Sequence, residues 1–232
     1  MQIKIWSDIR CPFCYIGKKH FETALNSFPH KDSITIEWKS FELDPKLQTA
    51  AHTDALSHFV ESKGIDRDRA QQMFDQVTAM AANTGLDFNL EQSIPANSLN
   101  AHRLLHLAKQ QGLANETKEA LLKAHLCEGK NIDDTNVLSD ISKSLGLDVN
   151  QVNQMLASDD FKYDVRQDEM EARNLGISSV PFFVIDGKYG VSGAQPADVF
   201  TRALKESWEK HQNEIHVIAN DSASCDTDGN CK

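Results

Sequence analysis

The sequence predicts an α/β fold in which a small sheet is interrupted by a long all-helical insertion. Three observations support this prediction. The chain opens with a strand, helix, strand pattern in about 45 residues, as in a βαβ unit. Helical periodicity without a convincing strand follows from about residue 49 to 157. Two short apolar runs near the C-terminus flank an Asp-Gly turn, which predicts a β-hairpin.

The composition restricts the class of protein. The 232 residues are 40% hydrophobic and 25% charged, which is typical of a soluble globular chain. A formal net charge of −10 argues against a nucleic-acid surface, which requires clustered Lys and Arg. No apolar run approaches the ~18 residues of a membrane span, and the N-terminus reads as a strand rather than a signal peptide. We therefore expect a cytoplasmic protein without nucleic-acid or membrane partners.

The N-terminal unit consists of two apolar strands and the helix between them. Residues Ile3 to Ile9 are predicted to form the first strand, and a helix is predicted from about Cys11 to Phe28, where Pro29 ends it. The second strand is indicated by apolar residues that alternate with polar ones: Ile34, Ile36 and Trp38.

The insertion is indicated by helical segments that each end at a glycine. The predicted helices are Asp66 to Asn83, Ser98 to Gln111, Glu116 to Glu128 and Asp133 to Leu145. We therefore divide the chain into a sheet-containing domain, residues 1–48 and 158–211, and an inserted helical domain, residues 49–157.

The C-terminal part returns to the sheet. A helix from Asp159 to Leu175 leads to the predicted hairpin, Val180 to Gly193, and Pro196 opens a last helix that is predicted to end at His211. Residues 212–232 hold few large apolar residues and are predicted to form a tail, which contains Cys225 and Cys231.

Cys11 and Cys14 lie where the first strand meets the first helix. The first N–H groups of a helix have no partner within it, so they and the helix dipole favour a thiolate at that end. We therefore predict a lowered pKa for Cys11, with Cys11 as the nucleophile and Cys14 as the resolving thiol. Phe13 adds an apolar surface but no charge or hydrogen-bond donor, so thiolate stabilisation is expected mainly from the helix end.

Two other interpretations of this cysteine pair are weaker. A structural zinc site usually needs four ligands, and no second Cys-x-x-Cys follows at finger-like spacing. A structural disulfide is disfavoured in a chain without an export signal. A dithiol redox centre is therefore the preferred interpretation.

Several motifs in order resemble the DsbA-like version of the thioredoxin fold, and more closely its FrnE-like branch. The resemblance covers about residues 1–211. It rests on Trp6-Ser-Asp before Cys11-Pro-Phe-Cys14, Phe41-Glu-Leu-Asp-Pro45, Asn97-Ser-Leu-Asn-Ala-His-Arg-Leu-Leu105, Gly129-Lys-Asn-Ile-Asp133, Gly176-Ile-Ser-Ser-Val-Pro-Phe-Phe183 and Gly193-Ala-Gln-Pro196. It implies a thioredoxin fold with a large all-helical insertion.

The resemblance also implies a cis peptide bond between Val180 and Pro181, packed against the two sulfurs. Without the resemblance, an ordinary trans proline at the start of a strand would be the default. A cis bond there presents the N–H and C=O of Val180 as an edge on which an extended substrate can pair beside Cys11. Phe13, Val180 and Pro181 are thus expected to contact substrate.

Two features depart from the DsbA pattern. Strongly oxidising members carry His where this chain has Phe13, so we expect a less oxidising couple, nearer the value of about −270 mV of thioredoxin than the −120 mV of DsbA. The tail pair, Cys225 and Cys231, lies beyond the part that DsbA-like chains need. We hypothesise that it exchanges disulfides with Cys11 and Cys14, and the alternative is a redox-silent pair.

Metal chemistry is weakly indicated. His102 and His106 have the spacing of a helical metal pair, but the Glu of His-Glu-x-x-His and a third ligand are absent, so packing or surface roles are preferred. Metal capture by Cys225, Cys231 and His216 is weaker still. Cys127 is expected to be a small core residue.

The sequence therefore predicts a thiol:disulfide oxidoreductase whose only cofactor is its own cysteine pair, with no metal. Expected partners are protein or peptide thiols and disulfides, and glutathione. One alternative is a glutathione-dependent isomerase or kappa-type glutathione transferase, which the chain resembles in outline; such enzymes typically use one Ser where this chain has two cysteines. The other alternative is a non-catalytic binder or holdase using the surface near Phe13 and Val180.

Overall fold

A computed structural model describes the backbone of residues 1–220 and the side chains of residues 1–212. The strands are β1 (Gln2–Ser7), β2 (Thr35–Ser40), β3 (Phe182–Ile185) and β4 (Tyr189–Ser192). The helices are α1 (Pro12–Asn26), α2 (Ala55–Lys63), α3 (Arg67–Ala82), α4 (Leu99–Gln110), α5 (Ala114–Leu126), α6 (Thr135–Ser144), α7 (Val149–Ala157), α8 (Lys162–Asn174) and α9 (Ala197–Asn220). Two short 3-10 turns are η1 (Lys31–Ser33) and η2 (Leu90–Gln92). This arrangement is a thioredoxin-like sheet with a helical insertion, and the predicted fold class is confirmed.

The sheet has the strand order β2-β1-β3-β4. Strand β1 runs parallel to β2 and antiparallel to β3, and β3 and β4 form the predicted antiparallel hairpin. In this register Trp6 lies opposite Phe182. The residues that follow β1 and those that precede β3 therefore lie at the same end of the sheet.

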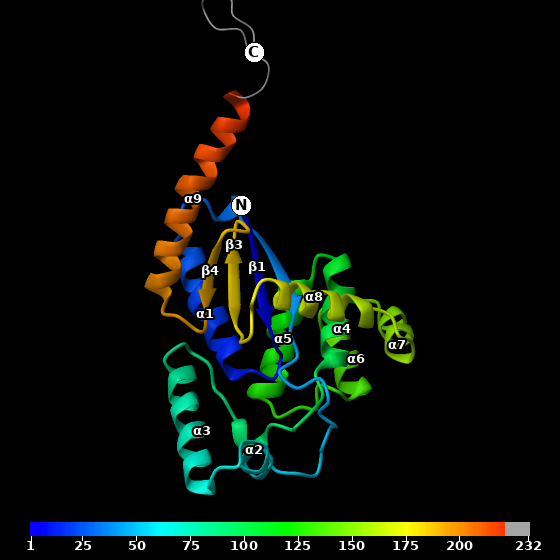
Figure 1. The fold of residues 1–232 in the computed structure, drawn as a ribbon. Coiled ribbons are helices and arrows are strands. Elements are labelled where there is room, and N and C mark those ends of the chain that lie inside the picture. The colour runs from blue at the N-terminus through cyan, green and yellow to red at the C-terminus, as the bar shows by residue number, and fades with distance from the viewer. Residues whose placement is uncertain (221–232) are drawn as a thin grey trace, which may run out of the picture.

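One face of the sheet is covered by α1 and α9, and α8 packs on the opposite side beside β2 (Figure 1). The core of the first face is apolar and aromatic. It includes Ile3, Ile5, Phe21, Phe183 and Phe200. Phe21 and Phe183 have ring centroids 5.4 Å apart. This packing holds α1 firmly on the sheet.

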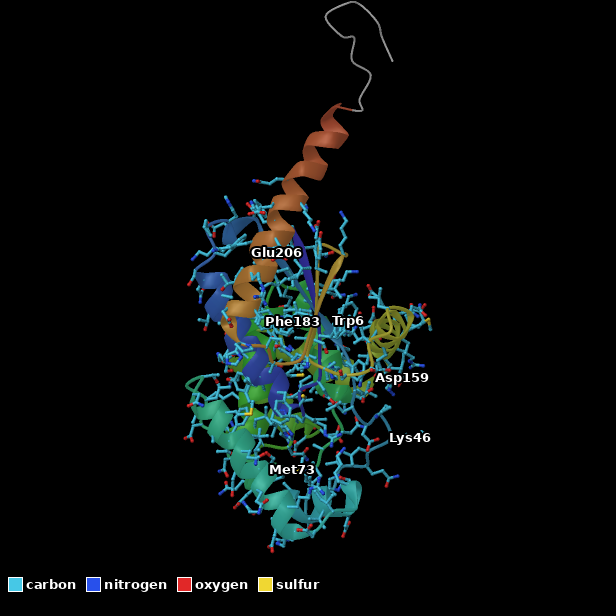
Figure 2. The ribbon with its side chains drawn as sticks, turned by 60° about the vertical axis from the view of Figure 1, so that its left-hand side comes forward. Trp6, Lys46, Met73, Asp159, Phe183 and Glu206 are labelled. Carbon is cyan, nitrogen blue, oxygen red and sulfur yellow. The ribbon has the colours of Figure 1, made fainter. Side chains whose placement is uncertain are left out.

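Trp6 anchors the opposite face, and Figure 2 shows it in the interior of the molecule beside Phe183. Its side chain packs with Ala172 and Ile177, and its indole N–H donates to the carbonyl of Asp168 at 2.9 Å. Trp6 thus fixes α8 to the end of β1 that leads to the cysteines.

The insertion has its own core but is tied to the sheet domain at several points. Ile9, expected at the end of the first strand, lies past the end of β1 and packs in the insertion core with Leu104 and Leu121. Lys18 of α1 contacts Glu119 of α5 at 2.5 Å. The insertion therefore packs directly behind the segment that carries the cysteines.

Some predicted boundaries are wrong. Helices α2 and α7 were not predicted, because each has only nine residues and a short apolar stripe. Helix α9 continues to Asn220 rather than ending at His211, since no Pro or Gly interrupts residues 212–220. Neither α9 nor any other helix in the described residues is long and apolar enough to cross a membrane.

Gly17 of α1 permits close packing against the segment before β3. A Cβ atom at this position would lie 2.9 Å from Cγ of Pro181 and 3.3 Å from Cα of Ala194. Such contacts are too short, so a side chain here would displace the Pro181 segment or α1.

We predict that Gly17→Ala destabilises the protein by roughly 1–3 kcal/mol through overpacking, although Gly→Ala within a helix ordinarily stabilises by about 0.5–1 kcal/mol. Urea unfolding measures the difference. Thr23→Ala on the exposed side of the same helix serves as the control and should change stability by less than about 1 kcal/mol. A stabilising Gly17→Ala would show that α1 and Pro181 are not in tight contact.

Candidate active site

The end of β1 and the start of α1 position Cys11. Cys11 is the N-cap residue of α1, with extended backbone angles (φ −86°, ψ 112°), and Pro12 occupies the first turn. Proline is well suited there because its missing N–H has no intrahelical partner to lose. The backbone N–H of Cys14 donates to the carbonyl of Cys11 at 3.0 Å, closing the turn between the two thiols.

Asp8 holds the loop before Cys11. Its carboxylate is fully buried and accepts hydrogen bonds from the N–H of Arg10 at 3.2 Å and the N–H of Leu43 at 2.8 Å. His102 of α4 lies 3.4 Å from the same carboxylate. Burial alone would raise the pKa of Asp8, but His102 and these backbone donors outweigh it and lower that pKa strongly. Asp8 is therefore a buried anion beneath the cysteine turn.

The two cysteines and the Val180–Pro181 segment meet at this end of the sheet. Both thiols are free and buried, with Cys11 4% and Cys14 1% exposed. The peptide bond between Val180 and Pro181 is cis, as the resemblance implies. The thiol of Cys11 donates to the carbonyl of Val180 at 3.6 Å, although 169 residues separate them in sequence. The fold thus brings the cysteine pair next to the cis Val180–Pro181 peptide bond.

Comparison with known proteins agrees with this geometry. Residues 2–205 match the family described as DSBA-like thioredoxin domain. The chain belongs to this DsbA-like family. The FrnE-like branch stays a prediction.

Three proteins illustrate what this chain is similar to. A crystal structure named probable DsbA oxidoreductase SCO1869, from Streptomyces coelicolor, is 36% identical with a TM-score of 0.85, over 100% of this chain and 98% of that one. The protein YwbO of Bacillus subtilis (strain 168) is 28% identical, over 90% of this chain and 98% of its own. The cytosolic disulfide reductase DsbM from Pseudomonas aeruginosa has the same fold at 16% identity, with a TM-score of 0.65 over 90% of this chain and 99% of that one.

The two neighbouring thiols of this DsbA-like site shift each other's pKa in opposite directions. The hydrogen bond to Cys14, followed by burial, raises the pKa of Cys11. Burial opposes ionisation of Cys14, but the hydrogen bond from Cys11 and the charge of Lys118 outweigh it and lower the pKa of Cys14. The prediction of a lowered pKa for Cys11 is therefore wrong for the reduced pair, because a helix-end argument omits the neighbouring thiol.

Lys118 is a site residue that sequence reasoning missed. It lies on α5 in the insertion, is fully buried, and donates from Nζ to the carbonyl of Ser7 at 3.2 Å. Burial lowers its pKa to about 8 against the opposing effects of Cys14, Asp8 and Cys11. A lysine on an amphipathic helix usually lies at the surface, so the only local signal was its neighbours Leu121 and Leu122 on the same helix.

Apolar side chains are exposed near the thiols. Phe13, between the cysteines, is 40% exposed, and Leu43, whose N–H binds Asp8, is 52% exposed. Val180 is partly buried and directs its carbonyl at Cys11. The predicted substrate-contacting residues Phe13, Val180 and Pro181 thus lie on the segments that surround Cys11.

The remaining candidate residues fall into separate environments. His102 contacts Asp8, whereas His106 lies 3.2 Å from the carboxylate of Asp168, so the preference for packing roles agrees with their contacts. Within the described residues no group of three His, Cys, Asp or Glu side chains is placed to hold a metal ion. Cys127 is partly buried beside an apolar cluster, and burial raises its pKa.

The predicted relay and metal residues of the C-terminal region, Cys225, Cys231 and the His216 side chain, lie outside the described residues and side chains. The described part of α9 runs away from the start of α1 (Figure 1). The relay therefore stays a prediction.

His125 of α5 makes the stability of this DsbA-like fold sensitive to acid. Burial, followed by the nearby charge of Arg10, lowers the pKa of His125 to about 4. An unfolded His titrates at about 6.5, so the unfolded chain binds more protons than the folded one between these values. The contribution of His125 to stability is complete above about pH 6.5 and is lost as the pH falls toward 4.

We predict that urea unfolding at about pH 5 gives a free energy of unfolding lower by about 2 kcal/mol than at about pH 7 on account of His125. His125→Gln should remove that part of the pH dependence. The exposed His52, replaced as His52→Gln, is the control and should leave the slope unchanged. Equal slopes in wild type and His125→Gln would contradict the prediction.

Proposed function

We infer that this chain is a thiol:disulfide oxidoreductase that acts through Cys11 and Cys14 on protein or small thiol substrates. The observation that supports this most directly is the Cys11 thiol at the N-cap of α1, 3.6 Å from the carbonyl of Val180 and beside the cis Pro181. An extended substrate pairing with the Val180 segment would bring its sulfur next to Cys11. The family assignment supports the same class of reaction.

In the oxidising direction, a substrate thiolate attacks Sγ of Cys11 in the Cys11–Cys14 disulfide. A bond between Cys11 and the substrate sulfur forms, the Cys11–Cys14 bond breaks, and the electron pair leaves on Cys14. A second substrate thiolate then attacks the substrate sulfur of the mixed disulfide and releases Cys11. Two substrate thiols become one disulfide while the enzyme disulfide becomes a dithiol. The reductive reaction runs these steps backwards.

Cys11 is assigned the exchange with substrate and Cys14 the resolving step. Cys11 is the more exposed of the two thiols and faces Val180, whereas Cys14 lies deeper, on the side of Ser7 and Lys118. A deeply buried sulfur with a lowered pKa is a good leaving group and a poor target for a bulky substrate. The dithiol supplies both electrons, so the proposed reaction requires no other cofactor.

Small thiols such as glutathione belong to the proposed substrates, and we propose a cytoplasmic location. The DsbM structure with GSH and its description as a cytosolic disulfide reductase support both proposals by analogy of fold. Titration of the couple against glutathione measures whether it exchanges with that thiol and where its potential lies.

We predict that Cys11→Ser reduces insulin reduction and the reactivation of scrambled ribonuclease to the uncatalysed rate, because the thiol that exchanges with substrate is missing and the remaining thiol of Cys14 is buried. Cys14→Ser should instead accumulate a mixed disulfide on Cys11, visible by mass spectrometry, because the resolving thiol is missing. Cys127→Ser removes the other described thiol and should retain full activity.

Full activity in Cys11→Ser would contradict the proposal. Conjugation or isomerisation activity that survives in Cys14→Ser would favour the glutathione-dependent class. Substrate binding that is unchanged with both thiols replaced, together with no turnover in wild type, would favour a binder.

The tail provides a further test of the same exchange chemistry. If Cys225 and Cys231 pass disulfides to the site, Cys14→Ser should form an intramolecular disulfide between Cys11 and the tail, detected by peptide mapping without reduction. The matched control is Cys14→Ser with both tail cysteines replaced by Ser, which should lack this adduct. Absence of the adduct in both proteins would leave the tail without a role in the exchange.

A further inference from the structure

Lys118 is an unusual buried cation. Its side chain is fully buried, and among the described residues its hydrogen-bond acceptor is a single backbone carbonyl, that of Ser7 at 3.2 Å. Among the described residues no carboxylate lies within ion-pair distance of Nζ. The ring of Trp38 lies 5.6 Å from the amine and adds a cation–π attraction, but an aromatic ring carries no net negative charge to balance the ammonium. A buried charge normally requires an opposite charge nearby. We therefore expect the negative charge that balances Lys118 to come from a group of the active site.

Lys18 provides the contrast within the same interface. It is also buried, at 2% exposed, but it contacts the carboxylates of Glu22 and Glu119 at 2.5 Å each. The fold therefore supplies close carboxylates to one buried lysine behind α1 and none to the other. This difference indicates that the charge of Lys118 is balanced by something other than an ordinary salt bridge.

The ionisable groups that face Lys118 come from α1, from the loop after β1 and from α4. They are Cys14, Cys11 and Lys18 on α1, Asp8 in the loop, and His102 on α4. Lys18 repels the amine but is paired with carboxylates, and burial lowers the pKa of His102. Asp8 is already engaged by two backbone N–H groups and by His102. The groups left to balance Lys118 are the thiols.

We propose that Lys118 of the helical insertion is the counter-ion of the Cys14 thiolate and acts as a positioning residue for disulfide exchange. This role of Lys118 follows from the site at which negative charge forms during the exchange reaction. When a substrate thiolate attacks Cys11, the Cys11–Cys14 bond breaks and the electron pair goes to Sγ of Cys14, with no proton transferred. The charge of Lys118, held in place by the carbonyl of Ser7, acts on Cys14 and stabilises the negative charge that forms on its sulfur.

The lysine also affects the equilibrium between the two forms. A group that stabilises the thiolate stabilises the reduced protein and makes its disulfide a stronger oxidant. By linkage, the thiolate must in turn hold the proton on Lys118 more tightly, so oxidation of the pair should lower the pKa of this amine. The role of Lys118 in disulfide exchange rests on the proposed function. Its effect on the thiol pKa and on the potential can be measured without a substrate.

The first test is Lys118→Met, which removes the charge and retains an unbranched apolar chain. We expect the pKa of the first thiol of the pair, read from ultraviolet thiolate absorbance, to rise by about one unit, a tenfold loss of thiolate at a given pH below it. At a pH above the thiol pKa of both proteins, the disulfide should become about 30 mV less oxidising, which is the same tenfold factor. Lys118→Arg retains the charge and should restore most of both values.

Lys18→Met is the matched control, because it removes a buried lysine from the same interface. It is expected to lower stability but to leave the thiol pKa and the potential unchanged. A purely structural role for Lys118 would lower stability in the same way and move neither value. If Lys118→Met is folded by circular dichroism and its thiol pKa and potential equal those of wild type, the proposal is wrong.

A measurement on the unmodified protein covers the case in which Lys118→Met does not fold. The Lys118 amine is titrated by NMR in the reduced and oxidised proteins, and its pKa should be higher in the reduced protein. Equal values would overturn the proposal. The thiolate titration and this NMR comparison require no substrate. A protein that shows both pKa shifts but no oxidoreductase activity would contradict the proposed function alone. An active protein that shows neither pKa shift would contradict only the role of Lys118.

Discussion

The buried carboxylate of Asp8 is the constraint on which the site depends. It accepts hydrogen bonds from the backbone N–H groups of Arg10 and Leu43, and so joins the loop before Cys11 to the segment after β2. His102 approaches the same group from the insertion. A buried anion without these partners would be strongly unfavourable. The loop before Cys11, the segment after β2 and α4 must therefore all pack around the Asp8 carboxylate. Because Asp8 fixes the loop that leads into α1, it also fixes the position of Cys11.

The helical insertion is part of the site. Ile9, just after Asp8, packs in the insertion core, and Lys118 reaches from α5 to the last carbonyl of β1. Glu119, the next residue on α5, binds Lys18 on α1. One turn of α5 therefore contacts both the strand before the cysteines and the helix after them. A shift of α5 would change the environment of Cys14 directly, which makes the interface between the two parts of the chain a determinant of thiol chemistry.

Sequence patterns predicted the local features of this site, because local features depend on local residues. The strand before Cys11, the helix after it and the hairpin after Pro181 are each encoded within about ten residues by periodicity and turn chemistry. The meeting of Cys11 with Val180 was obtained from family resemblance and not from spacing. Lys118 was not predicted, because its burial depends on segments distant in sequence that pack against α5. The predicted lowering of the pKa of Cys11 was wrong for the same reason, since that pKa depends on the neighbouring thiol and on burial in the folded chain.

Phe13 and Lys118 act on the redox couple in opposite directions. A phenylalanine between the cysteines offers no donor to a thiolate, which favours a weakly oxidising pair. A buried cation behind Cys14 favours the thiolate and hence a more oxidising pair. The first effect operates at Phe13, which is 40% exposed. The second operates at Cys14, which is 1% exposed and shielded from water, where charge interactions are stronger. If Lys118 is the counter-ion of the Cys14 thiolate, the insertion affects the potential of the cysteine pair in addition to the dipeptide between the cysteines.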